Sequence, residues 1–152
     1  MAGRVTPERA HALTTDEGWS HVDVRTVPEF EAGHPEGAFN VPFLVDGPRG
    51  RAPNERFVDG IRALFPTHDA KLVLGCQTAN RSARAAELLE AAGYGSIVVQ
   101  LAGWGGASDP FGRITTAGWK AAGLPVATRA RPGRAWAEIE ARIAPDTDLP
   151  RE

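Results

Sequence analysis

Short apolar runs alternate along this chain with segments in which apolar residues recur at helical spacing. The runs at residues 71–74 and 97–101 are almost wholly apolar, which is typical of strands buried in a parallel sheet. Residues 57–65 and 82–92 instead place their apolar side chains on one face of a helix. With a further short strand expected at residues 21–24, this alternation predicts an α/β fold, in which helices flank a central, mainly parallel sheet.

Capping and chain-breaking residues predict where the helices begin and end. Thr6 is expected to cap a short helix that ends near Thr15, and Gly33 to end a single helical turn. Asn54 is expected to cap the next helix, which Pro66 ends.

The other segments carry weaker signals. Residues 38–42 are expected to be extended and to lead into a loop at residues 47–53 that is rich in Gly, Pro and Arg. Residues 115–122 are expected to form a helix that ends before Gly123. A last amphipathic helix is marked by Trp136, Ile139 and Ile143.

Composition narrows the class of protein. The 152 residues suit one domain, and the 42% of hydrophobic residues suits a globular protein. A net charge of −2 gives no reason to expect a nucleic-acid or membrane partner. We see neither a secretory signal nor a membrane span in the sequence. The single cysteine cannot form an intramolecular disulfide, which fits a reducing compartment. The cytoplasm is therefore the expected location.

Candidate chemistry gathers around that cysteine, Cys76, which directly follows an apolar strand. Ligands bind at the carboxyl ends of strands in open α/β sheets. The polar turn to Arg81 can direct backbone N–H groups inward, and the helix from Ser82 adds a positive dipole end. A helix end is worth only about 0.3–1 kcal/mol, so the turn and Arg81 must supply most of the stabilisation of a thiolate. Lone cysteines are most often buried hydrophobes, but the polar residues after Cys76 argue against a buried position.

Several ordered motifs resemble the rhodanese family of sulfurtransferases. The likeness extends from Thr6 to Val126. Its amino-terminal signature, active-site loop and closing pattern correspond to residues 22–25, 29–30, 33–42, 76–82, 93–94, 101–104 and 119–126.

The resemblance implies a rhodanese-like domain at residues 1–126, followed by an extension at residues 127–152 with a short amphipathic helix and a frayed tail. It implies that Cys76 attacks the outer sulfur of a small-molecule donor such as thiosulfate, releases sulfite and carries the sulfur as a persulfide. The acceptor would be cyanide, a small thiol or a protein thiol. No cofactor and no metal is implied, and the oligomeric state stays open.

The resemblance also assigns roles to the site residues. Cys76 is the nucleophile, and a cradle of mostly backbone amides is formed by Gln77, Thr78, Ala79, Asn80 and Arg81. Arg81 is also expected to contact the anionic end of the donor. Asp23 and Arg25 match the early signature and are expected to brace the fold beside the loop as a buried ion pair. Trp104 is a candidate for the mouth of the pocket.

This chain departs from the family pattern in three places. Ala79 stands where many members have glycine, which costs about 1 kcal/mol if the position needs a positive φ. Gln77 stands where thiosulfate-using members often have a basic residue, so thiosulfate is expected to be a poorer donor. The segment at residues 105–116 is longer than in the minimal family pattern. The alternatives for it are a lid, an acceptor-docking loop and an ordinary surface insertion.

Other functions remain open alternatives. Cysteine phosphatases and arsenate reductases also place a thiolate in an arginine-ended loop, but with five residues between Cys and Arg where this chain has four. A rhodanese-like binding or regulatory module often lacks the cysteine, whereas this chain has both Cys76 and Arg81. A dedicated persulfide carrier is a further alternative, intermediate between a sulfurtransferase and a binding module.

Overall fold

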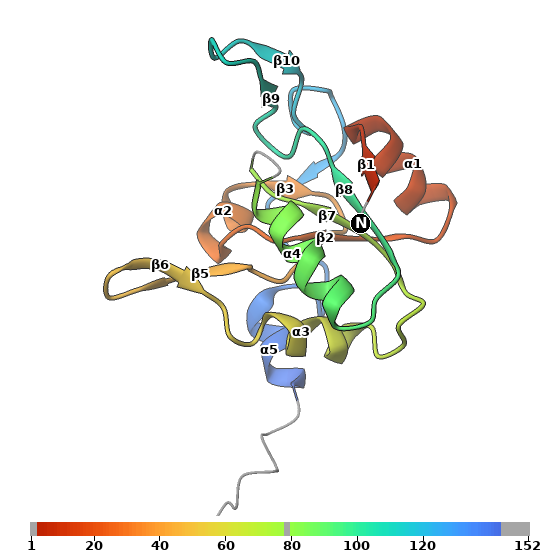
Figure 1. Ribbon diagram of the computed structural model, residues 1–152, viewed down its shortest axis with the longest axis vertical. Coiled ribbons are helices and arrows are strands. Elements are labelled where there is room, and N and C mark those ends of the chain that lie inside the picture. Colours follow the sequence, from red (N-terminus) through yellow and green to blue (C-terminus); the bar gives the residue numbers. More distant parts are fainter. Residues whose placement is uncertain (1–2, 78–79, 144–152) are drawn as a thin grey trace, which may run out of the picture.

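The computed structural model describes residues 3–77 and 80–143. A five-stranded sheet lies at its centre, in the order β1-β8-β7-β2-β4, and every neighbouring pair is parallel (Figure 1). The strands are β1 (Gly3–Val5), β8 (Ser96–Gln100), β7 (Lys71–Gly75), β2 (Ser20–Asp23) and β4 (Phe39–Asn40). The expected α/β architecture with a parallel sheet is therefore confirmed.

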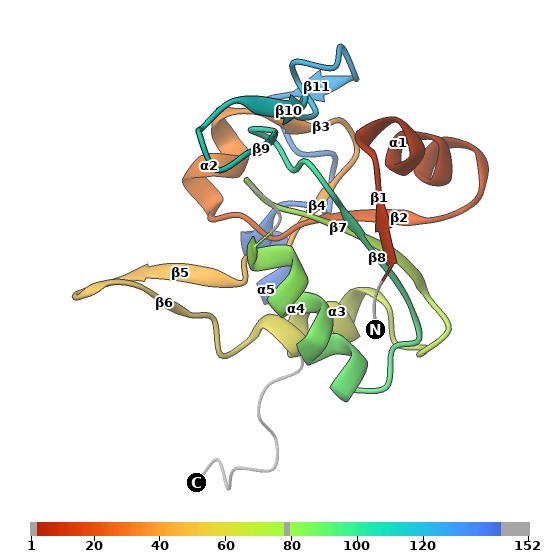
Figure 2. The same cartoon turned by 45° about the horizontal axis from the view of Figure 1, so that its top comes forward.

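Alternate residues of the strands enter two separate cores, as the two-residue period of a strand requires. Leu72 and Leu74 of β7 face the larger core, which contains side chains from α3 (Phe57–Leu64), α4 (Asn80–Ala91) and α5 (Trp136–Arg142). Val73 faces the smaller core, with Trp119 and side chains from α1 (Pro7–Asp16). Figure 2 shows α1 across the sheet from α3, α4 and α5.

The Thr6 cap and the helix end at Gly33 are confirmed, whereas α2 begins two residues before the turn expected at residues 29–32. The Thr6 side chain accepts the N–H of Arg9 at the start of α1. Thr26 and Glu29 form a reciprocal capping box at the start of α2 (Val27–Ala32), and Gly33 follows its last residue.

The chain beyond residue 126 joins the same fold. The β11 strand (Val126–Ala127) pairs with β3 (His34–Pro35), and the Asn40 N–H donates to the Arg134 carbonyl. Trp136 of α5 is 8% exposed and packs on Gly60 of α3, where an added Cβ would lie 2.8 Å from the indole ring. The predicted tail at residues 145–152 lies outside the described residues.

Several local predictions are wrong. Residues 47–53 belong to an antiparallel hairpin of β5 (Leu44–Gly47) and β6 (Gly50–Pro53), not to an irregular loop. Asn54 does not cap α3, because its Oδ1 accepts the N–H of Arg56 two residues later and its Nδ2 donates to the Pro42 carbonyl.

The helix expected at residues 115–122 is also absent. The segment starts in β10 (Ile114–Thr116), which pairs with β9 (Ala107–Ser108), and then forms turns. Gly118 packs against the backbone of Trp104 and Gly106 so tightly that a Cβ would overlap the Trp104 carbonyl oxygen. This close approach of two backbones replaces the helix.

Among the described residues, no helix is long and apolar enough to cross a lipid bilayer.

Candidate active site

Cys76 directly follows β7, which lies between β8 and β2 in the sheet. Its Sγ accepts the backbone N–H of Ser82, near the start of α4, at 3.3 Å. The Ser82 hydroxyl lies at the same distance from the sulfur. The amino-terminal turn of α4 thus directs a backbone N–H and a hydroxyl group at the sulfur.

Cys76 is more buried than its polar neighbours predict. Its exposed fraction is 2%, Ser82 is fully buried, and Cys76 belongs to the larger core. The expectation of a position outside the core is wrong, because Cys76 packs with the apolar residues of that core. Ser82, six residues later, supplies polar contacts within an otherwise apolar setting.

The segment after β8 holds the backbone of the cysteine in place. Trp104 donates its N–H to the Cys76 carbonyl at 2.7 Å, and Gly105 donates to the Gln77 carbonyl at 2.8 Å. Gly103 has φ +63°, and a Cβ there would overlap the Cys76 carbonyl oxygen. Glycine therefore permits both the turn and the approach at this position.

The predicted cradle is described only in part. Thr78 and Ala79 lie outside the described residues. Gln77 is half-buried beside Gly105, and Asn80 is exposed at the first position of α4. The part these residues play in binding a donor stays a prediction.

Arg81 is paired with a carboxylate. Its Nη1 and Nη2 donate to the two carboxylate oxygens of Glu29 at 2.8 and 3.0 Å. Partial burial alone would raise the pKa of Glu29, but hydrogen bonds from Arg81 and Thr26 and the Arg81 charge lower it to about 2. The same pairing raises the pKa of Arg81. Glu29 also lies 3.7 Å from Arg51 Nη2, so two guanidinium groups share this carboxylate. Both terminal nitrogens of Arg81, expected to face a donor, therefore bind within the protein.

Asp23 and Arg25 form a buried ion pair at the carboxyl end of β2. Arg25 Nη2 lies 2.8 Å from Asp23 Oδ2, and both side chains are 3% exposed. Arg25 also donates to the Gly33 carbonyl at 2.6 Å and stacks on the Trp104 ring at 4.7 Å. The pair thus connects β2, the end of α2 and the segment that holds Cys76.

A small cavity of about 10 Å³ separates this ion pair from the cysteine. Within the described residues it has room for about one water molecule. Cys76, Asp23, Arg25 and Trp104 all line it, together with His21. Trp104, expected at a pocket mouth, therefore lines this space beside the cysteine.

Two residues of the site have no functional assignment from the sequence. Ser82 was assigned only to the start of a helix, and nothing in the sequence shows that its N–H meets the sulfur. Glu29 was detectable as a capping residue, because a threonine stands three residues before it. Its ion pair with Arg81 joins α2 to α4, and no sequence pattern predicts this contact.

No cluster of three or more metal-ligating side chains occurs within residues 3–77 and 80–143.

Comparison with known proteins adds independent information. A family model described as Rhodanese-like domain matches residues 6–106. Thiosulfate sulfurtransferase 18 of Arabidopsis thaliana is 42% identical over 79 residues, which cover 51% of this chain and 57% of that protein. Senescence-associated protein DIN1 of Raphanus sativus is 37% identical over 88 residues, covering 58% and 48% respectively. The chain thus spans about half the length of these curated relatives.

A solved structure matches over most of both chains. The crystal structure of Rv0390 from M. tuberculosis superposes with a TM-score of 0.67 at 28% identity, covering 84% of this chain and 98% of that one.

Proposed function

The chain belongs to the rhodanese family, and from this membership we propose that it is a sulfurtransferase that carries sulfur as a persulfide on Cys76. The observation that carries the proposal is the position of Cys76 Sγ, at the end of the central β7 and 3.3 Å from the Ser82 N–H. Two of the relatives are named thiosulfate sulfurtransferases, which supports the same class of reaction.

In the first step the Cys76 thiolate attacks the outer sulfur of the donor. With thiosulfate, a new S–S bond forms at Cys76, the original S–S bond breaks, and its electron pair leaves with sulfite. The cysteine then carries a persulfide, Cys–S–S⁻, and its negative charge moves to the terminal sulfur. The Ser82 N–H, 3.3 Å from Cys76 Sγ, is the donor that would act on the sulfur as its charge changes.

In the second step a nucleophilic acceptor attacks the terminal sulfur. Cyanide leaves as thiocyanate, and a thiolate leaves as a new persulfide; in both cases the Cys76 thiolate is regenerated. The exchange is redox-neutral overall and needs no cofactor.

The Arg81–Glu29 pair bears on the choice of donor. Because both terminal nitrogens of Arg81 bind Glu29, Arg81 offers a doubly charged donor less attraction than an unpaired guanidinium would. Gln77 is also uncharged. Both features favour a donor of lower charge than thiosulfate, such as a small-molecule persulfide.

The same pairing gives a phosphatase less support. A phosphatase needs its loop arginine to bind phosphate, and here both terminal nitrogens of Arg81 bind Glu29. The proposed cytoplasmic location remains a prediction, because the relatives include proteins named as chloroplastic.

A thiocyanate assay with thiosulfate or an alkyl persulfide as donor and cyanide as acceptor tests the proposal. The wild-type protein is expected to turn over both, more efficiently with the persulfide, and Cys76→Ser to turn over neither. Ser82→Ala retains the backbone N–H and is expected to keep measurable activity. Turnover by Cys76→Ser equal to that of the wild type would refute the proposal.

A further inference from the structure

A second cavity, of about 300 Å³, opens at the amino-terminal half of β2. It is bounded by α1, by Ser20 and His21 of β2 and by the chain around Arg131 and Arg134. Asp23 of β2 and Gly75 of β7, the residue before Cys76, lie at the opposite, carboxyl ends of these two strands. The volume is at the lower end of the range for small-molecule sites.

Two arginines converge on one wall of this cavity, at Gly37. Arg134 Nη1 donates to the Gly37 carbonyl at 2.6 Å, and the guanidinium stacks on Phe39 at 4.4 Å. The Arg131 guanidinium packs on the same glycine, where an added Cβ would lie 3.2 Å from its Cζ. The turn at Gly37 therefore brings two positive charges side by side.

Neither guanidinium is neutralised by the described part of the protein. None of the ion pairs found there includes Arg131 or Arg134. The cavity lining has one acidic residue, Glu36, and it forms none of these pairs either. Burial and the neighbouring charge of Arg131 lower the pKa of Arg134.

Aromatic rings supply an apolar part of the lining. Trp19, Phe39 and the buried Trp119 all line the cavity. His21 adds no charge near neutral pH, because burial, opposed by Asp23, lowers its pKa to about 4. The cavity thus combines a cationic corner with a ring-lined wall.

We propose that this cavity binds a small organic anion, whose carboxylate or phosphate group is held by Arg131 and Arg134 and whose apolar part lies against Trp19 and Trp119. An anion supplies a counter-charge that the described residues do not, and it accepts hydrogen bonds from the guanidinium N–H groups. A neutral ligand of the same shape gains only the contacts with the rings. His21 and Trp119 line both this cavity and the small one beside the cysteine, but Cys76 lines only the small one.

Nuclear magnetic resonance of the tryptophan indole N–H groups tests the proposal, with benzoate and phenyl phosphate as probes. Millimolar concentrations of either probe are expected to shift the Trp19 and Trp119 signals and to leave that of Trp136, which packs on α3, in place. Benzamide, the neutral counterpart of benzoate, is expected to bind about tenfold more weakly.

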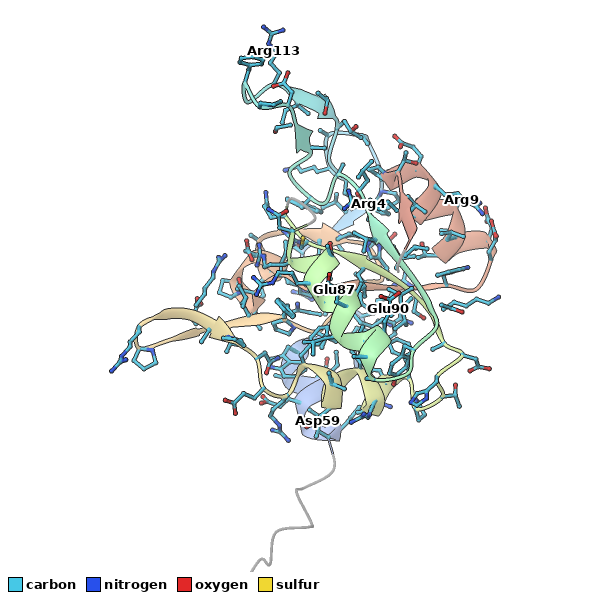
Figure 3. All side chains as sticks on the ribbon, in the orientation of Figure 1. Arg4, Arg9, Asp59, Glu87, Glu90 and Arg113 are labelled. Carbon is cyan, nitrogen blue, oxygen red and sulfur yellow. The ribbon has the colours of Figure 1, made fainter. Side chains whose placement is uncertain are left out.

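Two variants, each lacking one positive charge, distinguish binding at this site from general electrostatic attraction to the protein. Arg131→Gln is expected to weaken phenyl phosphate binding about tenfold. Arg113→Gln is the matched control, because Arg113 lies at the outer end of the β9–β10 hairpin (Figure 3). No shift with either anion, equal binding of benzamide, or equal loss in both variants would overturn the proposal.

Discussion

Glu29 and Arg81 are the two residues whose pairing most changes the expected chemistry of the site. The arginine was expected to face an anionic donor, yet its terminal nitrogens bind a carboxylate within the protein. The Glu29 pKa of about 2 lies below its ordinary value of 4.5. The pair's contribution to stability is therefore full above the ordinary value and is lost as the pH falls through about 2.

Replacing Glu29 by glutamine tests how this pair affects donor choice. Glutamine can keep the capping interaction with Thr26 but removes the negative charge, so Arg81 becomes available to a donor. The KM for thiosulfate is expected to fall about threefold in Glu29→Gln, equivalent to roughly 0.6 kcal/mol. Glu31→Gln removes the same charge from the exposed side of α2 and is expected to leave the KM unchanged. Equal KM values in the two variants would contradict the assigned role of the pair.

Among the elements, the short segment between β8 and β9 holds the backbone of Cys76 in position. Gly103, Trp104 and Gly105 contact the backbone of Cys76 and Gln77 directly. The hairpin that follows projects from the body of the molecule, with Arg113 near its end (Figure 3). Phe111 on the same hairpin is 85% exposed. The insertion thus has an anchored base and an exposed end.

Two glycine substitutions separate the anchor from the hairpin end. Gly103 and Gly112 both have positive φ, but only at Gly103 does an added Cβ meet neighbouring backbone. Gly112→Ala is expected to cost about 1 kcal/mol in unfolding free energy and to keep activity. Gly103→Ala is expected to cost about 3 kcal/mol and to lose most activity, because the Cys76 carbonyl must move. Chemical denaturation and the thiocyanate assay measure both effects, and equal losses in the two variants would refute the anchoring role.

Patterns within one element were predictable, and contacts between elements were not. The strands around residues 71–74 and 97–101 followed from continuous apolar runs, because burial on both faces leaves no polar position. The helix expected at residues 115–122 failed because the fit of Gly118 against Trp104 depends on a distant backbone. At the site, the position of Cys76 at a strand end was predictable. Its Ser82 contact and the Glu29–Arg81 pair require the folded chain.

Across the whole molecule, both cores depend on segments far apart in the sequence. Trp136 and Ile139 of α5 belong to the same core as Leu72 and Leu74 of β7. The predicted boundary at residue 126 therefore separates segments that share one core, and the division of the chain into a domain and an extension remains a prediction. Trp119, in the smaller core, stacks edge-on against His21 at 5.0 Å.

The buried His21 predicts how global stability responds to acid. Burial, partly opposed by Asp23, lowers its pKa from 6.5 to about 4. Between these values the unfolded chain binds a proton that the folded protein does not, so stability falls as the pH falls. The unfolding free energy is expected to drop by about 2 kcal/mol from pH 7 to pH 5 through this residue.

Urea unfolding of the wild type and of His21→Gln at both pH values measures that contribution. The variant is expected to lose most of the pH dependence, while His68→Gln, which replaces an exposed histidine, is expected to retain it. An unchanged pH dependence in His21→Gln would contradict the role of the buried imidazole.

The most direct test of the proposed function is the intact mass of the protein after incubation with a sulfane-sulfur donor. Thiosulfate and an alkyl persulfide are supplied separately, excess donor is removed, and peptide mapping locates any added sulfur. The proposal predicts a gain of one sulfur atom on Cys76, reversed by cyanide and absent in Cys76→Ala. No gain with either donor, or an equal gain in Cys76→Ala, would contradict it.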